Sequence, residues 1–142
     1  MSVIVNLLIW VHLLALAMGF AGGIAMSQIG PRLAAAAPDQ RATWWPLANT
    51  FTGIAHAGLV LLLVTGPLIL WLKYQGGGGL SAAFAIKMGL MVLAIIAIGA
   101  SSWGKARLKR GDEGGARVMA AAGPVTMLLM LGVVLSAVFA FN

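Results

Sequence analysis

Three ionisable side chains stand inside long apolar stretches of this 142-residue sequence: His12, His56 and Lys87. Titratable groups are costly in an apolar environment, so their presence there usually has a purpose. Two neutral imidazoles can supply the axial ligands of a haem iron, or they can bind copper together with methionine thioethers. Each can also simply hydrogen-bond to a carbonyl or hydroxyl of a neighbouring helix. The residue types alone leave a haem site, a copper site and a structural role open.

Lys87 has two interpretations of its own. Its ammonium group can pair with a haem propionate or a substrate carboxylate, or it can relay protons. It can also extend along an apolar helix so that its charge reaches the nearer membrane surface. Arg117 is a second basic candidate for a propionate or proton partner.

The elements that must position these residues are four apolar segments. Hydrophobic residues make up 61% of the chain and charged residues only 8%, whereas soluble domains carry about 25% charged residues. About 20 apolar residues cross a bilayer, and four segments exceed that length, over residues 3–26, 48–71, 80–103 and 120–141. The sequence therefore predicts an all-α protein, an integral membrane four-helix bundle that forms a single domain over residues 1–142.

The connections between these segments are expected to be short loops. Residues 30–47 contain three prolines and are expected to form a turn-rich loop. Residues 76–79 are four glycines and suggest a flexible turn. Residues 104–117 form the third connection, a basic loop.

The distribution of positive charge predicts the orientation. Seven of the nine lysines and arginines fall on the side of the membrane that receives the first and third connections: Arg32, Arg41, Lys105, Arg107, Lys109, Arg110 and Arg117. Positive loops stay in the cytoplasm, so both termini are predicted to be periplasmic (N-out, C-out), in a bacterial inner membrane. The net charge of +6 thus reflects topology, and no nucleic-acid partner is expected.

The depths of the two histidines suggest that they meet. At 1.5 Å per residue, His12 lies roughly 13 Å from the N-terminal side of the membrane. His56 lies roughly 18 Å from that side in a core about 30 Å thick. Small residues such as Gly19 and Gly22 share the face of His12 and leave room for close packing or a flat cofactor. We therefore expect the two rings near one depth in mid-membrane, on adjacent antiparallel helices.

Several kinds of chemistry are excluded. The chain has no cysteine, which removes disulfides, thiolate metal sites and cysteine nucleophiles. Its three carboxylates, Asp39, Asp112 and Glu113, fall in the connections. Paired-carboxylate catalysis and a Ser-His-Asp triad within the membrane are therefore excluded.

Several different short motifs lie in or beside the four segments. They are His12, Phe20-Ala21-Gly22 and Pro31-Arg32-Leu33 in and after the first segment, Thr65-Gly66 in the second, Lys87 early in the third, and Arg117 leading to Pro124 in the fourth. In these motifs the chain resembles the small four-helix membrane proteins that group HemJ-type protoporphyrinogen oxidases with CopD-like copper-resistance membrane domains. It departs from the HemJ pattern at residues 121–123, Ala-Ala-Gly, where a polar Asn-Glu pair precedes the proline.

The resemblance implies a membrane haem b protein that exchanges electrons with a quinone or a porphyrinogen, with a HemJ-like oxidoreductase as the enzyme activity that it suggests. His12 and His56 would be the axial ligands, or one the ligand and the other a pocket residue. Lys87 and Arg117 would be the propionate or proton partners. The second histidine favours an electron-transfer haem over an open substrate site. Two alternatives stand beside this one: a CopD-like copper-binding or transport protein that uses the histidines and methionines, and a non-catalytic accessory subunit of a homo-oligomer or larger membrane complex.

Overall fold

The protein is described by a computed structural model over residues 2–75 and 82–140, the side chains of residues 83 and 140 excepted. Within these ranges it consists of four long helices: α1 Val3–Ala35, α2 Arg41–Tyr74, α3 Ala82–Lys109 and α4 Gly114–Ala140. Each helix contains an apolar stretch long enough to cross a membrane. The prediction of an all-α membrane bundle is therefore confirmed.

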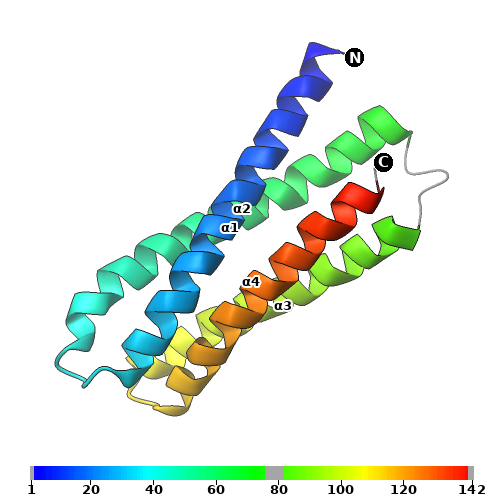
Figure 1. Cartoon of the computed structure of the whole chain (residues 1–142). Coiled ribbons are helices and arrows are strands. Elements are labelled where there is room, and N and C mark those ends of the chain that lie inside the picture. The colour runs from blue at the N-terminus through cyan, green and yellow to red at the C-terminus, as the bar shows by residue number, and fades with distance from the viewer. Residues whose placement is uncertain (1, 76–81, 141–142) are drawn as a thin grey trace.

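The four helices form two antiparallel pairs, α1 with α2 and α3 with α4, and the contact of α1 with α4 joins the pairs (Figure 1). The start of α1 and the described end of α4 lie at one end of the bundle, here called the terminal end. The connections at residues 36–40 and 110–113 lie at the opposite end, here called the loop end.

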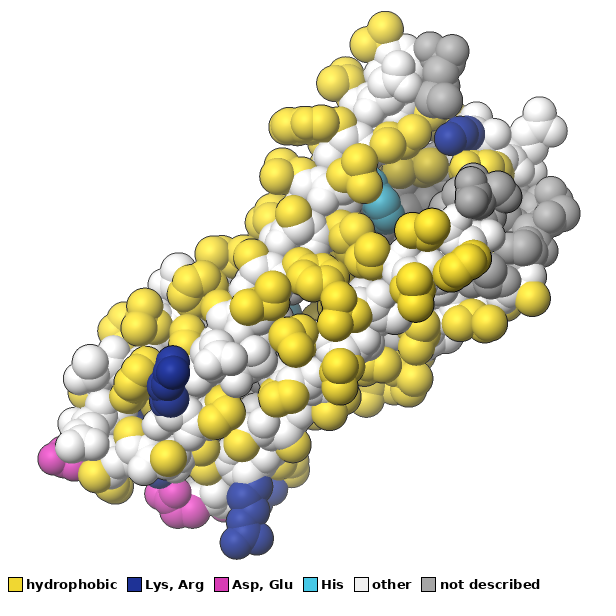
Figure 2. Space-filling view, viewed as in Figure 1, with side chains coloured by type: hydrophobic (Ala, Val, Ile, Leu, Met, Phe, Trp, Pro, Cys, Tyr) yellow, Lys and Arg dark blue, Asp and Glu magenta, His cyan; other side chains and the backbone are white. Residues whose placement is uncertain are grey.

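The outer surface along the helices is apolar. Figure 2 shows hydrophobic side chains over the length of the bundle, with acidic and several basic side chains at the loop end. Large apolar side chains such as Trp10, Trp71 and Leu135 are 62%, 74% and 62% exposed. Such a surface fits contact with the hydrocarbon of a lipid bilayer, where apolar side chains need no cover.

The interior holds two clusters of small and flexible apolar side chains. One lies toward the loop end and comprises Met26, Ile29, Leu33, Ala48, Leu108, Ala116 and Met119. The other, here called the inner apolar cluster, comprises Ala15, Leu62, Met91, Ala94, Met130 and Val133. Four of the eight methionines thus fill gaps between helices, a role that suits their unbranched side chains.

The helices are longer than the apolar segments, so the two connections are shorter than the predicted ranges of residues 30–47 and 104–117. Only residues 36–40 connect α1 to α2, and only residues 110–113 connect α3 to α4. The buried stripe of α1 continues at helical spacing through Ile29 to Leu33, which is fully buried, so packing holds the helix past Pro31. An internal proline removes one backbone hydrogen bond, which neighbouring helices can offset. The predicted glycine turn at 76–79, and positions 80, 81 and 141 of the predicted spans, lie outside the described residues.

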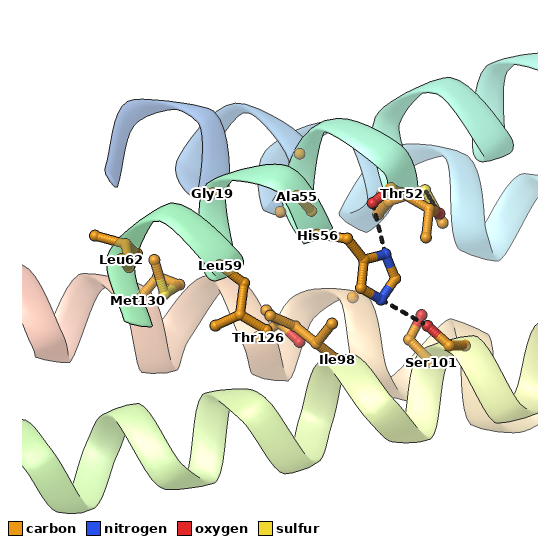
Figure 3. A pocket seen from close by; sticks show the side chains of 15 residues that line it. Gly19, Thr52, Ala55, His56, Leu59, Leu62, Ile98, Ser101, Thr126 and Met130 are labelled. Atoms are coloured by element: carbon orange, nitrogen blue, oxygen red, sulfur yellow. Dashed lines mark hydrogen bonds between the residues drawn. The ribbon is translucent and has the colours of Figure 1, made fainter. Parts of the chain in front are cut away.

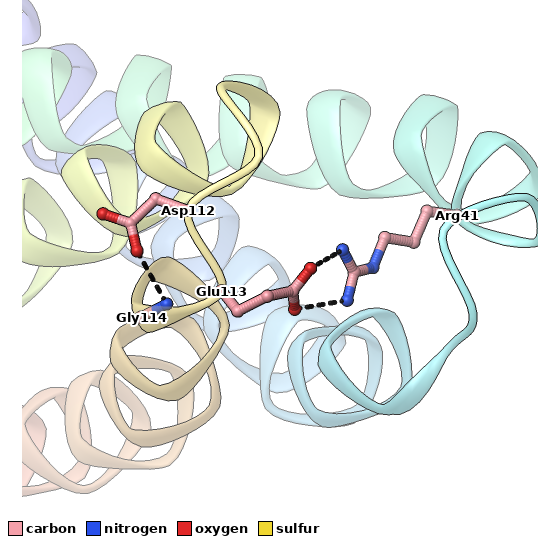
Figure 4. Close-up of polar contacts among 4 residues, drawn as sticks. All are labelled: Arg41, Asp112, Glu113 and Gly114. Carbon is pink, nitrogen blue, oxygen red and sulfur yellow. Dashed lines mark hydrogen bonds and ion pairs between the residues drawn. The ribbon is translucent and has the colours of Figure 1, made fainter.

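Polar contacts at the loop end fasten the start of α2 to the connection between α3 and α4. The guanidinium of Arg41 donates two hydrogen bonds of 2.9 Å to the two carboxylate oxygens of Glu113 (Figure 4). Asp112 accepts a hydrogen bond of 2.9 Å from the backbone N–H of Gly114 at the start of α4, and it also pairs with Arg107. The hydrogen bond from Arg41 holds the pKa of Glu113 below its usual value, and that from Arg107 lowers the pKa of Asp112.

Candidate functional site

Glycines set the register between α1 and α2. A Cβ atom placed on Gly22 would lie 2.7 Å from the Cβ of Ala55, and one on Gly58 would lie 2.7 Å from the carbonyl oxygen of Ala15. The same atom on Gly58 would lie 3.0 Å from the backbone nitrogen of Gly19. Only residues without side chains allow two helices to approach this closely. The contact fixes which residues face one another along the whole length of the pair.

This register brings His12 of α1 to Thr65 of α2. The Nδ1 atom of His12 lies 2.7 Å from Oγ1 of Thr65, and that hydroxyl donates its own proton to the carbonyl of Leu61 at 2.6 Å. A hydroxyl has one proton to donate, so Thr65 must accept from Nδ1–H of His12. The hydrogen-bond network therefore assigns the tautomer in which Nε2 carries the lone pair. Gly66 adds space, since a Cβ there would lie 3.6 Å from Cε1 of the ring.

His12 lines a cavity of about 280 Å³ in the half of the bundle nearer the terminal end, here called the His12 cavity. All four helices contribute to it, through Ile9, His12, Leu13, Leu16, Gly66, Ile69, Leu70, Lys73, Tyr74, Phe84, Lys87 and Ala137. Figure 2 shows a histidine among apolar side chains on this half of the molecule. The described residues around the cavity include two lysines and a phenol but no carboxylate, which suits an apolar ligand that carries negative charge.

His56 lies in a second, smaller cavity of about 40 Å³, here called the His56 cavity (Figure 3). Its Nδ1–H donates to the backbone carbonyl of Thr52 at 2.8 Å, and its Nε2 accepts from the hydroxyl of Ser102 on α3 at 3.1 Å. Ser101, Thr126 and Met130 also line this cavity. Both ring nitrogens of His56 therefore have partners within the protein. This matches the hydrogen-bonded structural role, one of the three interpretations that the sequence left open.

The two histidines do not meet, and the expectation that they share one depth is wrong. His56 precedes Thr65, the partner of His12, by nine residues of α2, a rise of about 14 Å. Leu62, part of the inner apolar cluster, lies between them in that helix. Depth counted from the predicted helix ends failed because the glycine contacts, rather than equal distances from the membrane surfaces, set the register. Neither cavity contains both rings.

The two basic candidates are also separated. Lys87 lines the His12 cavity. Arg117 is exposed in the first turn of α4, whereas Ala137 is the residue through which α4 reaches that cavity. Twenty residues of helix separate the two positions, a rise of about 30 Å. Arg117 therefore has no direct role at His12 in this structure.

Sequence reasoning missed the partners of both imidazoles. Thr65 and Ser102 hold the rings of His12 and His56, and Lys73 and Tyr74 complete the polar side of the larger cavity. The available signal was their polarity: Thr65 and Ser102 interrupt apolar stretches, just as the histidines do. The register between the helices decides that Thr65 faces His12 and Ser102 faces His56, and this register cannot be read from the sequence.

Comparisons with protein-family models, with curated proteins and with solved structures found no match to this chain. Over the described residues, no group of three or more His, Cys, Asp or Glu side chains is placed to hold a metal ion.

Proposed function

We propose that the chain is a membrane haem b protein in which His12 alone supplies the protein ligand to the iron. It would exchange electrons with a quinone or a porphyrinogen, as the HemJ resemblance implies. The observation that carries this proposal is the hydrogen bond from Nδ1 of His12 to Thr65. Histidines that bind metals almost always donate their other ring N–H to a fixed acceptor, which orients the ring and makes Nε2 more basic.

The lining of the His12 cavity supports the same ligand class. Ile69, Leu70 and Phe84 offer an apolar wall for a macrocycle, and the ammonium groups of Lys73 and Lys87 can offset the charge of propionates. A cavity of about 280 Å³ lies just below the usual range for small-molecule sites, about 300–1,000 Å³.

Each residue has a defined task in this proposal. Thr65 holds the His12 ring in one tautomer and one orientation. Lys73 and Lys87, which line the cavity, would hold the anionic edge of the ligand. A haem held by one histidine supplies one-electron chemistry and leaves a coordination position open. His56 has no ligand role and remains a hydrogen-bonded residue of the smaller cavity.

We propose the orientation on charge alone. The loop end would face the cytoplasm and the terminal end the periplasm, because seven of the nine lysines and arginines belong to helix ends and connections at the loop end. The His12 cavity would then lie in the periplasmic half of a bacterial inner membrane.

An absorption spectrum of the purified wild-type protein tests the proposal. We expect a Soret band when haem is supplied during expression, with the high-spin features of an iron that has one protein ligand. The absence of a Soret band would refute the haem assignment. Stoichiometric copper in the same preparation would then favour the copper-binding alternative.

A further inference from the structure

The boundary between α2 and α3 near the loop end is polar. The helix pairs that pack closely over the described residues are α1–α2, α3–α4 and α1–α4, so α2 and α3 meet mainly through side chains. Their contacts include Ser102 to His56 at 3.1 Å and Lys105 to Asn49 at 3.0 Å. Lys105 follows Ser102 by three residues and Asn49 precedes His56 by seven, so the two contacts stack along both helices, one or two turns apart. We call this stack the α2–α3 seam.

The seam runs from the exposed Asn49 to Ser102, which lines the His56 cavity. Asn49 at its outer end is exposed, and Lys105 is half-buried with its ammonium group at that exposed amide. At the inner end, the His56 cavity has room for roughly two or three water molecules at about 40 Å³. Hydroxyl groups of Thr52, Ser101 and Ser102 line it and can bind such waters.

The inner end of this route is closed by apolar side chains. Leu62 and Met130 line the His56 cavity and belong to the inner apolar cluster, which packs between that cavity and the level of Thr65. Leu62 and Met130 are only 3% exposed. Among the described residues, water that reaches His56 from the loop end therefore meets apolar side chains on the way toward His12.

We propose that the α2–α3 seam is a hydrated half-channel that carries protons between the aqueous phase at the loop end and the imidazole of His56. In the transfer step, Nε2 of His56 takes a proton from a hydronium ion of the seam water and becomes the N–H of an imidazolium. The hydroxyl of Ser102 turns from donor to acceptor, and Nδ1–H keeps its bond to the carbonyl of Thr52. Release of the proton reverses the step. This inference does not depend on the proposed haem.

The surroundings of His56 suit this role. Lys105 is the ionisable side chain that α3 contributes to the seam, and Asn49 accepts from it at the outer end. The residues that α1 and α4 contribute to the cavity carry no ionisable group: Gly19, Gly22, Gly23 and Met26 from α1, and Gly123, Thr126 and Met130 from α4. The imidazole is therefore the single titratable group of the described lining, and its protonation reports directly on the route.

Cysteine labelling tests hydration, since the natural chain has no cysteine. Ser102→Cys places a thiol in the seam, and Gly99→Cys is the matched control, because Gly99 is exposed on the same helix and a Cβ there meets nothing within 4 Å. In oriented membrane vesicles, a charged methanethiosulfonate applied to the loop end should modify Ser102→Cys on the order of tenfold faster or more. The difference follows from ionisation, because a thiol that is shielded from water forms less of the reactive thiolate. Desolvation that raises a thiol pKa by one unit already removes about nine-tenths of the thiolate. Equal, slow modification of both variants would refute the half-channel.

A measurement on the wild-type chain covers the case in which a variant fails to fold. Water-edited ¹⁵N spectra of the His56 ring in lipid nanodiscs should show transfer of magnetisation from water to the ring nitrogens. A ring that receives no magnetisation from water is sealed from it, and that result would overturn the proposal.

Discussion

His12 and His56 stand on adjacent helices but about 14 Å apart along the bundle, each in its own cavity with its own hydroxyl partner. The separation gives the protein two imidazoles in different chemical situations. His12 faces a large cavity that also contains two lysines, whereas His56 faces a small one lined by hydroxyl groups. The two histidines should therefore respond differently to the same substitution.

His12→Ala should abolish the Soret band, and His56→Ala should retain it, because the ligand is assigned to His12. His56→Ala should lower stability only modestly, by about 0.6 kcal/mol for the lost interhelical hydrogen bond. Absorption spectra and unfolding curves of both variants in detergent provide the measurement. Loss of the band in both variants at unchanged stability would instead favour ligation by both histidines after a rearrangement of the bundle.

Thr65→Val should weaken haem binding by about 10–100-fold, because it removes the acceptor that orients the His12 ring. It should also destabilise the fold by about 0.6 kcal/mol, the average loss for one interhelical hydrogen bond in a membrane. Haem titration and unfolding measure the two effects separately. Thr65→Ser keeps the hydroxyl and is the control. If Thr65→Ser binds haem no better than Thr65→Val, the hydrogen bond to His12 does not contribute to haem binding.

Gly22→Leu should destabilise the bundle by about 1–3 kcal/mol or more, because even a Cβ there would lie 2.7 Å from that of Ala55. Gly53→Leu is the matched control, since it lies on α2 with nothing within 4 Å of an added Cβ. Unfolding in a detergent series compares the two. Similar behaviour of both variants would mean that Gly22 does not set the α1–α2 register.

Acidification should loosen the loop end. Arg41 and Arg107 lower the pKa values of Glu113 and Asp112 through hydrogen bonds, so both carboxylates contribute stability only when ionised. That contribution is fully present above the usual carboxyl pKa values of about 4 and is lost as pH falls through the lower folded values. Thermal unfolding between about pH 6 and about pH 2 should show the loss, and Glu113→Gln should reduce it. An identical pH profile for Glu113→Gln would exclude Glu113 as its source.

The orientation can be tested with a reporter that is active only in the periplasm. Fused after residue 142, it should be active in a bacterial host, and inserted at residues 110–113 it should be inactive, because basic connections stay in the cytoplasm. The opposite pattern would reverse the proposed topology and would move the His12 cavity to the cytoplasmic half of the membrane.

The amino-acid sequence by itself determined the membrane-spanning, all-α character of this protein, because apolar length and composition decide that outcome without reference to neighbours. It also identified His12, His56 and Lys87, since each is a visible exception in an apolar stretch. The helix ends were harder to predict from the sequence. Leu33 packs in the core and Arg41 pairs with Glu113, and these contacts across the bundle, not the local sequence, extend the helices to include them.

Only the tertiary structure decided which polar groups meet. The pairing of His12 with Thr65, rather than with His56, follows from the register at which Gly22 meets Ala55 and Gly58 meets Ala15. A sliding of one helix by two turns would leave the sequence pattern about equally satisfied, because each helix has an apolar stretch long enough to tolerate it. Steric fit at the glycines removes that freedom, and with it the possibility of one site holding both histidines.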